Sequence, residues 1–471
     1  MQARGLTRAE CRRALDSLRW QDGTPLLAGG VQLLKNPGVI GDCSNVIRTA
    51  PVESDSGPDR RSGDQSAVNA WPRALVIGGS VGGLFAANLL RTVGWDVAVF
   101  ERATGHLGDR GTGIGTREEL FAMMRRLGLG IDASTMVAVR GRLALGRDGT
   151  IVHERATPSV TSAWARIWRP LKDALPQDCY RGGMMLTALE QDAGRVTAIF
   201  GDGARETGDL LVGADGMHSA VRAALMPACR PCYAGYVAWR GVVEERDLDP
   251  ALRETVFDHM IFGLPDGELM LSIPMPGAAD GPHRGGRRCH FVWFRPVEES
   301  ALPELCTDAA GRRHGLAIPP PLIRPELIAH LKAEAGVLLA PQLAALVAAT
   351  AQIILQPIFD LATPCMIAGR VALLGDAAFV ARPHVATGVM KAALDAQGLA
   401  DALAAADIAA ALARYDSERR PFGSWLVERG RHIAGAVNAR GNHGTRIETV
   451  MREYGSAGLV RGQPIAARVP G

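Results

Sequence analysis

A short apolar run, a glycine-rich turn and a second apolar stretch form the clearest hydrophobic pattern in the chain. Residues 74–77 read Ala-Leu-Val-Ile, and a glycine-rich turn at 78–83 follows them. A short continuous apolar run beside a turn is typical of a buried strand. Apolar residues then continue at helical spacing from Val81 to Thr92, before a further apolar run at 97–100. The pattern predicts a strand, a helix that ends near Gly94, and a second strand.

The rest of the chain predicts more strands and helices, with an antiparallel sheet between them. Alternating residues at 236–239, 269–273 and 290–294 are typical of antiparallel strands with one buried face. Helices are expected near 120–129, 171–175, 389–413 and 424–437, and strands at 196–200, 210–214 and 370–374. We therefore expect an α/β domain built from two parts of the chain, with a sheet domain inserted between them.

The first seventy residues differ from those that follow. They lack sustained periodicity and end in a Ser-, Gly-, Asp- and Arg-rich run, which is typical of a linker. We assign no chemistry to them. The expected organisation is an extension at 1–70, a nucleotide-binding domain at 71–225 and 366–440, a sheet domain at 226–365 and a tail at 441–471.

Composition narrows the class of protein. The chain has 471 residues, is 47% hydrophobic and carries a formal net charge of +3, which does not favour nucleic acid as a partner. No apolar run approaches the roughly 18 to 20 residues of a membrane helix, and the N-terminus lacks the apolar core of a secretory signal. The eight cysteines lack framework spacing. We expect a soluble cytoplasmic protein without a membrane partner.

Cys229 and Cys232 form a lone CxxC pair. Such a pair is compatible with half a zinc site or a redox pair. No second CxxC follows, and His218 does not have the spacing of a zinc finger. We therefore favour two ordinary thiols and expect no metal.

The turn at 78–83 has the features of a dinucleotide-binding loop. Gly78 suits the tight turn, the small Ser80 still allows a ligand to approach the backbone, and Gly83 lets the helix touch the strand. Free N–H groups at the helix start can bind a diphosphate. Glu101 ends the next strand and would accept hydrogen bonds from ribose hydroxyls, which disfavours a 2′-phosphate. The alternative is a tight turn with an exposed glutamate.

Two further clusters carry aspartates at the ends of predicted strands. Gly375 and Asp376 precede Gly388, which opens an Ala-rich helix whose N-terminus could face negative charge on a cofactor ring. Asp215 and Gly216 form the other cluster. Helix capping explains an aspartate at such a position without any ligand.

In this order and spacing, the three clusters resemble the single-component (class A) FAD-dependent aromatic hydroxylases over residues 71–431. The resemblance implies a Rossmann-like FAD-binding domain of the glutathione-reductase type, an inserted antiparallel-sheet substrate domain and C-terminal helices. It implies hydroxylation of an electron-rich aromatic or N-heteroaromatic ring with FAD, NADH or NADPH, and O₂, through a flavin hydroperoxide. Residues 233–241 and 375–384 resemble the 2,6-dihydroxypyridine 3-monooxygenase subgroup. A homodimer is compatible with this resemblance.

The resemblance also implies residue roles. The turn at 78–83 would bind the FAD diphosphate, Glu101 the adenosine ribose and Asp376 the ribityl chain. Asp215 matches a motif that touches both FAD and the pyridine nucleotide, and residues 383–388 would line the flavin ring. The candidate cofactor-binding residues are Gly78, Ser80, Gly82, Gly83, Glu101, Arg102, Arg110, Asp215, Gly375, Asp376, Pro383 and Gly388.

His384 is the candidate for deprotonating a ring hydroxyl, because imidazole titrates in the useful range. The alternative is an ordinary solvent-facing histidine. The strands that carry Tyr236, Trp239, Arg240 and Trp293 are expected to wall the substrate side, although aromatic residues on a sheet are more commonly core.

The chain departs from the family pattern at several positions. Ala386 stands where the class usually has glycine, Met390 where it often has a polar residue, and Trp164 where many relatives have a polar FAD contact. These departures keep a second hypothesis open, namely a FAD-binding protein without hydroxylase turnover, such as a reductase, an oxidase or a degenerate regulator. A flavin-dependent halogenase is disfavoured, because no two tryptophans flank a single residue.

Overall fold

The computed structural model describes residues 71–105, 107–109, 113–116, 118–130, 133–277, 281–315, 317–441 and 443–455. The predictions for residues 1–70, for Arg110 and for the end of the tail lie outside the described residues. Within the described ranges, no helix combines the length and the apolar composition needed to span a bilayer.

A six-stranded sheet forms the first layer, in the order β18-β19-β12-β1-β2-β8. All neighbouring pairs are parallel except β18 with β19. Its strands are β1 (Arg73–Ile77), β2 (Asp96–Glu101), β8 (Tyr180–Gly182), β12 (Leu210–Gly213), β18 (Ile367–Ala368) and β19 (Val371–Leu373). Because β19 comes from the far part of the chain and lies beside β12, the sheet is assembled from two separate segments, as the sequence predicted.

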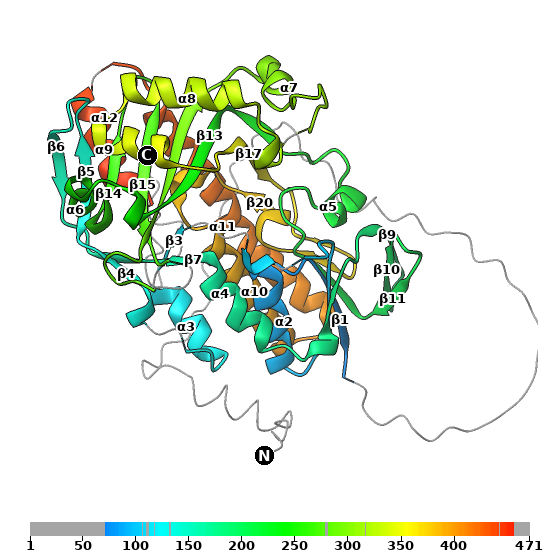
Figure 1. Cartoon of the computed structure of the whole chain (residues 1–471). Coiled ribbons are helices and arrows are strands. Elements are labelled where there is room, and N and C mark those ends of the chain that lie inside the picture. The colour runs from blue at the N-terminus through cyan, green and yellow to red at the C-terminus, as the bar shows by residue number, and fades with distance from the viewer. Residues whose placement is uncertain are drawn as a thin grey trace, which may run out of the picture.

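Two helices pack together beside this sheet (Figure 1). Helix α2 (Val81–Thr92) has the predicted bounds, and α10 (Gly388–Ala405) follows the second glycine-aspartate turn. The continuous helix expected at 389–413 is wrong in one respect. Asp407 accepts a hydrogen bond from the N–H of Ala410 and begins a new helix, α11 (Ile408–Val437), as an aspartate does at an N-cap.

An eight-stranded sheet forms the second layer, in the order β20-β17-β13-β16-β15-β14-β5-β6. The predicted antiparallel pairing is present, since β16 pairs antiparallel with both β13 and β15. Its strands are β5 (Gly141–Leu145), β6 (Ile151–Arg155), β13 (Cys232–Glu244), β14 (His259–Gly263), β15 (Leu269–Met275), β16 (Arg288–Pro296), β17 (Ile354–Ala362) and β20 (Phe379–Val380). Strands β5 and β6 come from residues 71–225, which were expected to belong to the nucleotide-binding domain. They join this sheet instead, because β5 pairs in parallel with β14.

Shorter elements complete the fold. Two three-stranded sheets have the orders β11-β10-β9 and β3-β7-β4. Their strands are β3 (Gly113–Gly115), β4 (Val137–Val139), β7 (Ser159–Ala163), β9 (Leu186–Gln191), β10 (Val196–Phe200) and β11 (Arg205–Gly208). The remaining helices are α3 (Glu118–Arg126), α4 (Trp164–Asp173), α5 (Ala220–Leu225), α6 (Pro250–Asp258), α7 (Leu302–Leu305), α8 (Pro325–Leu338), α9 (Pro341–Ala349) and α12 (His443–Glu453).

The two faces of the eight-stranded sheet pack differently. Trp239 and Trp293 lie opposite each other on β13 and β16 and belong to the core that α6, α8 and α9 cover. In Figure 1, α8 and α9 lie over this outer face. Side chains alternate along a strand, so Arg240 faces the other side, together with Val292 opposite it. The strands that carry the four named residues thus turn Tyr236 and Arg240 to the inner side, while the two tryptophans belong to the helix-covered core.

Residues 443–453, expected as part of a tail, instead form α12. Its apolar side packs on the inner face of the sheet, because Val450, Met451 and Tyr454 are buried in the same core as Phe262 and Phe294. Arg142 on β5 donates hydrogen bonds to the carbonyls of Met451 (3.0 Å) and Tyr454 (2.7 Å). The C-terminal helix thus packs against the inner face of this sheet.

Candidate functional site

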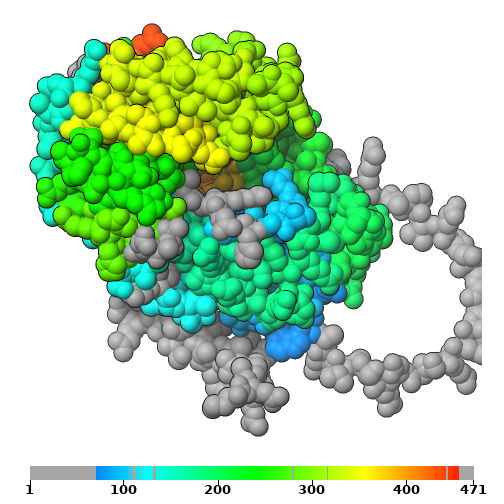
Figure 2. All heavy atoms as spheres, in the orientation of Figure 1, coloured from blue at the N-terminus to red at the C-terminus, as the bar shows by residue number. Residues whose placement is uncertain are grey.

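One cavity of about 1170 Å³ lies between the two layers. It is lined by the first glycine turn, by Asp215, by the Gly375-Asp376 turn and by the inner face of the eight-stranded sheet. Figure 2 shows the surface hollowed where the yellow and green atoms of the sheet layer meet the blue-green atoms of the nucleotide-binding layer. The two turns that the sequence singled out are therefore joined by one continuous space.

The first glycine turn has no room for side chains where it is tightest. Gly78 has φ +110°, and a Cβ there would lie 2.4 Å from the carbonyl oxygen of Ala214. A Cβ on Gly83 would lie 1.9 Å from the carbonyl oxygen of Gly78. Glycine is required at both positions, by backbone conformation at the first and by helix–strand contact at the second.

The start of α2 leaves its backbone donors available. The N-cap residue Ser80 makes no side-chain cap, and the first turn contains no acidic residue. The first N–H groups of a helix lack partners within the helix, and Ser80, Val81 and Gly82 all line the cavity. This end of α2 fits a diphosphate.

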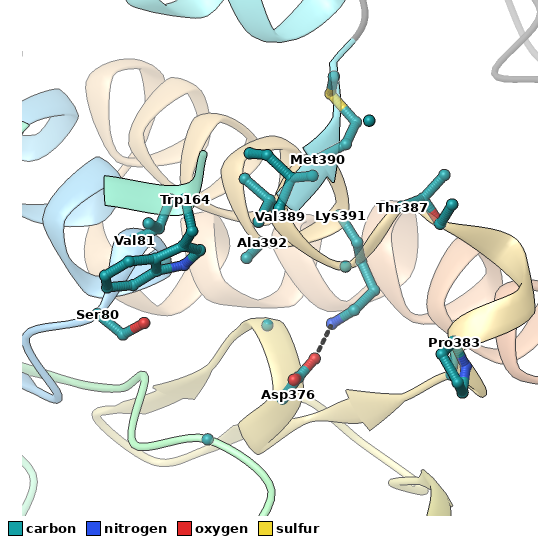
Figure 3. Close-up of a pocket in the computed structure, with 18 of the residues that line it drawn as sticks. Ser80, Val81, Trp164, Asp376, Pro383, Thr387, Val389, Met390, Lys391 and Ala392 are labelled. Atoms are coloured by element: carbon teal, nitrogen blue, oxygen red, sulfur yellow. Dashed lines mark ion pairs between the residues drawn. The ribbon is translucent and has the colours of Figure 1, made fainter. Parts of the chain in front are cut away.

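Trp168 is a positioning residue that the sequence analysis missed. Its indole N–H donates to the carbonyl oxygen of Gly79 at 2.9 Å, and its ring stacks on Trp164 with the centroids 6.0 Å apart. Trp164 lines the cavity, as Ser80 and Val81 do (Figure 3). A single tryptophan in a helical pattern gives no signal of such a role, because the contact is long-range.

Glu101 is buried at the end of β2 and lines the cavity. Its two carboxylate oxygens accept hydrogen bonds from the N–H groups of Gly79 (2.7 Å) and Ala103 (2.9 Å). Each carboxylate oxygen can accept a second hydrogen bond. The side chain is thus fixed by backbone donors and keeps acceptor capacity for ribose hydroxyls.

Asp376 faces the cavity beside a buried lysine (Figure 3). The Lys391 ammonium lies 3.8 Å from carboxylate oxygens of both Asp376 and Asp395, and its side chain is 1% exposed. Asp395 also accepts hydrogen bonds from the Arg419 guanidinium and from the N–H of Gly375. These ion pairs and hydrogen bonds fix the Gly375-Asp376 turn. Half of the Asp376 side chain remains exposed.

The start of α10 also lines the cavity. Gly388, Val389 and Met390 line it, and the N-cap Thr387 makes no side-chain cap. Ala386 has φ +50°, the left-handed conformation that favours glycine. This conformation explains why the sequence pattern leads one to expect glycine at position 386. Alanine at this position is strained. Met390 contributes an apolar surface, which suits a flat ring.

Asp215 both caps a helix and lines the cavity. Its carboxylate accepts hydrogen bonds from the Ser219 hydroxyl (2.5 Å) and from the N–H of Ala220 (2.7 Å). The Ser219 hydroxyl in turn accepts from the N–H of Arg222, and the Arg222 guanidinium donates to the carbonyl of Ala377 at 2.9 Å. Arg222 thereby ties the Asp215 loop to the Asp376 turn.

His384 does not reach the cavity, which corrects its expected catalytic role. Its side chain is fully buried, and Nε2 lies 2.8 Å from the Tyr236 hydroxyl. The rings of Phe294 and Tyr454 also contact it. Burial, with a smaller contribution from the Arg382 charge, lowers the pKa of His384 to about 3. The neutral imidazole packs among these aromatic rings, outside the residues that line the cavity. It is therefore not available to accept a substrate proton.

Most of the other candidate residues lie together. Gly83 supports the turn without lining the cavity, and Arg110 lies outside the described residues. The candidates that line the cavity are Gly78, Ser80, Gly82, Glu101, Arg102, Asp215, Gly375, Asp376, Pro383 and Gly388. The two helix starts, the fixed glutamate and the exposed aspartate fit the diphosphate, ribose and ribityl groups of FAD.

The CxxC pair lies away from this cavity. The Cys229 thiol is 3.9 Å from the carbonyl oxygen of Ala362, and Cys232 is exposed. Among the described residues, no group of three or more histidine, cysteine, aspartate or glutamate side chains is placed to hold a metal ion.

Comparisons with known proteins place the chain among flavin-dependent enzymes. A family described as FAD binding domain-like matches residues 233–360. The chain is 31% identical over 332 residues to the 2,6-dihydroxypyridine 3-monooxygenase of Paenarthrobacter nicotinovorans, covering 70% of this chain and 82% of that protein. It is 30% identical over 364 residues to the FAD-dependent urate hydroxylase of Klebsiella pneumoniae, covering 74% and 85%.

Solved structures give the same relationship. The structure of 2,6-dihydroxypyridine-3-hydroxylase from Arthrobacter nicotinovorans has a TM-score of 0.75 and 28% identity, and covers 80% of this chain and 95% of that one. The structure of Klebsiella pneumoniae HpxO complexed with FAD and uric acid has a TM-score of 0.64 and 28% identity, covering 81% and 92%.

Replacing Ala386 by glycine should stabilise the protein. Glycine removes the left-handed strain, about 1 kcal/mol, and loses part of that gain to its larger unfolded-state entropy. We expect an increase of up to about 1 kcal/mol in the free energy of unfolding, measured with urea. Ala409→Gly, on the exposed side of α11, should lower it by about 0.5 to 1 kcal/mol. A decrease for both variants would contradict the strain at Ala386.

The buried His384 should make stability depend on pH. Its folded pKa of about 3 lies below the ordinary 6.5, so the unfolded chain binds a proton first as pH falls. Its contribution to stability is complete above about pH 6.5 and decreases between about pH 6.5 and 3. His384→Gln, which can still bond Tyr236, should show a weaker loss of stability over this range. Urea unfolding at several pH values measures this, with His283→Gln at an exposed position as the control; equal slopes would refute the assignment.

Lys391 should support cofactor binding. Lys391→Met removes the cation that lies between Asp376 and Asp395, so the exposed carboxylate loses its orientation. We expect the Kd for FAD, measured by fluorescence titration of the apoprotein, to rise about tenfold or more, equivalent to roughly 1.4 kcal/mol. Lys332→Met is the control, since Lys332 donates to the carbonyls of Ala348 and Thr350 away from the cavity. Unchanged FAD affinity in Lys391→Met would contradict this role.

Proposed function

Because the chain belongs to the single-component, class A FAD-dependent aromatic monooxygenases, we propose that its substrate is an electron-rich, hydroxylated N-heteroaromatic ring. A 2,6-dihydroxypyridine-like ring is the leading candidate, and a simple phenol is the alternative. The relatives named for dihydroxypyridine and urate support this substrate class. In the balanced reaction, the substrate, NAD(P)H, a proton and O₂ give the hydroxylated product, NAD(P)⁺ and water.

The single observation that carries the proposal is the continuity of the cavity. One space reaches from the start of α2, past the start of α10, to the inner face of the eight-stranded sheet. A long two-ended cofactor and a small ring beside it fit such a space. Separate pockets would favour a nucleotide-binding protein without ring chemistry.

The nucleotide-binding side positions the cofactor. We propose that the start of α2 binds the diphosphate, Glu101 the ribose hydroxyls and Asp376 the ribityl chain. When bound, FAD supplies hydride acceptance and oxygen activation. The start of α10 presents the positive end of a helix dipole to the cavity, which stabilises negative charge that develops there.

The sheet side positions the substrate and excludes water. Leu271, Ile273, Val292 and Phe294 line this end of the cavity, and all four lie on the inner face of the sheet. An apolar wall holds a flat ring and keeps water away from the reacting atoms, which limits side reactions. We propose that β5 and β6 belong to this substrate domain, together with most of 226–365. Because NAD(P)H is the reductant, we place the activity in the cytoplasm.

The test is a reaction with the purified protein. We expect a yellow protein that consumes NAD(P)H and O₂ faster when 2,6-dihydroxypyridine is present, and that releases a product heavier by one oxygen atom. Oxygen uptake, NAD(P)H absorbance and product mass measure the three quantities. Substrate-stimulated consumption that yields only H₂O₂ would favour a protein without hydroxylase turnover. A colourless protein that does not take up FAD would overturn the proposal.

A further inference from the structure

The substrate end of the cavity contains a cation without a counter-charge. Arg240 on β13 lines the cavity, and within the described residues its guanidinium forms no ion pair or hydrogen bond. Its Nε is buried and has no hydrogen-bond partner in the part of the chain that the structure describes. Arginine remains charged in proteins. A partly buried charge without a counter-charge is unfavourable, so a negatively charged ligand in the cavity would balance it.

His290 lies on the neighbouring strand, on the same face. It is opposite Val242 on β13 and Ile273 on β15, which places it beside Arg240 by the two-residue period of a strand. The side chain is 2% exposed and lines the cavity, and neither ring nitrogen has a hydrogen-bond partner among the described residues. Burial, followed by the Arg240 charge, lowers the pKa of His290 to about 3. A neutral imidazole can donate one hydrogen bond and accept another.

The other polar groups at this end do not neutralise Arg240. The titratable groups that line this end of the cavity with it include His290 on β16, Arg142 on β5 and Tyr454 after α12. Arg142 donates hydrogen bonds to carbonyls at the end of α12, and burial raises the pKa of the Tyr454 phenol, so Tyr454 remains neutral. The acidic residues that line the cavity are Glu101, Asp215 and Asp376 among the described residues. All three come from the nucleotide-binding side.

We propose that Arg240 and His290 form an anion site that binds a negatively charged oxygen on the substrate ring. This inference rests on the proposed function and specifies the state in which the substrate binds. Arg240 supplies the charge and planar N–H donors, and His290 supplies a further donor. Leu271, Val292 and Phe294 provide the apolar surface beside them.

For a ring hydroxyl, the site replaces a general base. The O–H bond of the substrate breaks in solution or during binding, the proton goes to water, and the electron pair remains on the oxygen. Delocalised into the ring, that pair makes the ring carbons more nucleophilic. The same site would also accept a carboxylate on the ring. A carboxylate would accept hydrogen bonds from the same two side chains. Unlike a ring oxyanion, it does not donate electron density into the ring.

Ligand binding to the FAD-loaded protein tests the anion site. The Kd of 2,6-dihydroxypyridine, read from the change in flavin absorbance, should fall as the pH rises through the ionisation of the free ligand. Arg240→Gln should raise the Kd of the ionised ligand about 10- to 100-fold, as expected for a lost charge-assisted hydrogen bond, and should remove this pH dependence. His290→Phe should weaken binding less and leave the pH dependence in place. A Kd that is insensitive to both pH and Arg240→Gln would overturn the inference.

Arg288→Gln is the matched control. Arg288 lies on β16, as His290 does, but pairs with Glu244 at 3.9 Å and is not among the residues that line the cavity. Its Kd values should equal those of the unaltered protein. FAD content and urea unfolding identify any variant that fails to fold, and Arg240→Lys, which keeps the charge, should recover part of the affinity.

Two ligands distinguish the sources of the anion. 4-Hydroxybenzoate carries a carboxylate at every pH used, and its methyl ester does not. Binding of 4-hydroxybenzoate with Arg240-dependent affinity would assign the site to carboxylates. Binding of ionised 2,6-dihydroxypyridine alone would assign it to ring oxyanions, and equal binding of the neutral ester would refute an anion site.

Failure of this inference is separable from failure of the proposed function. If the unaltered protein hydroxylates 2,6-dihydroxypyridine while Arg240→Gln binds it with unchanged Kd, the function stands and the anion site is wrong. If the unaltered protein binds anionic rings through Arg240 but forms no hydroxylated product, the anion site stands and the function is wrong.

Discussion

Close packing of small residues at the contact of α2 and α10 controls the rest of this structure. A Cβ on Gly82 would lie 3.1 Å from the Cβ of Ala392, and a Cβ on Gly375 would lie 3.2 Å from that same atom. The two helices and the second turn therefore approach as closely as their backbones allow. This approach brings the starts of both helices to one cavity, although they come from distant parts of the sequence. Larger side chains here would separate the two ends of the proposed FAD site.

The two sides of the cavity differ in how they treat charge. On the nucleotide-binding side each carboxylate has local partners, as in the pairing of Asp376 with Lys391 or the backbone donors around Glu101. On the sheet side, Arg240 and His290 lack such partners among the described residues. A folded protein tolerates unpaired buried polar groups chiefly where a ligand completes them. Under the proposed function, the cofactor occupies the side whose carboxylates are paired, and the substrate occupies the side that holds the unpaired arginine.

The sequence predicted those features that depend on local patterns. The strand, glycine turn and helix at 74–92 follow from periodicity and from the steric needs of Gly78 and Gly83, and the structure has them, with the strand one residue longer and the helix as expected. Other features depend on which side of a strand faces which layer. Trp239 and Arg240 are adjacent in sequence but lie on opposite faces. Nothing in their composition indicates which face is buried under helices. His384 shows the same limit, because its neighbour Pro383 lines the cavity while the imidazole turns into an aromatic core.

The proposed function of this protein depends most directly on one cofactor that joins the starts of α2 and α10. A crystal structure of the protein with FAD measures this. We expect the diphosphate oxygens within hydrogen-bond distance of the N–H groups of Val81 and Gly82, and a ribityl hydroxyl within hydrogen-bond distance of the Asp376 carboxylate. A diphosphate bound elsewhere, or a ribityl chain directed away from Asp376, would contradict the account.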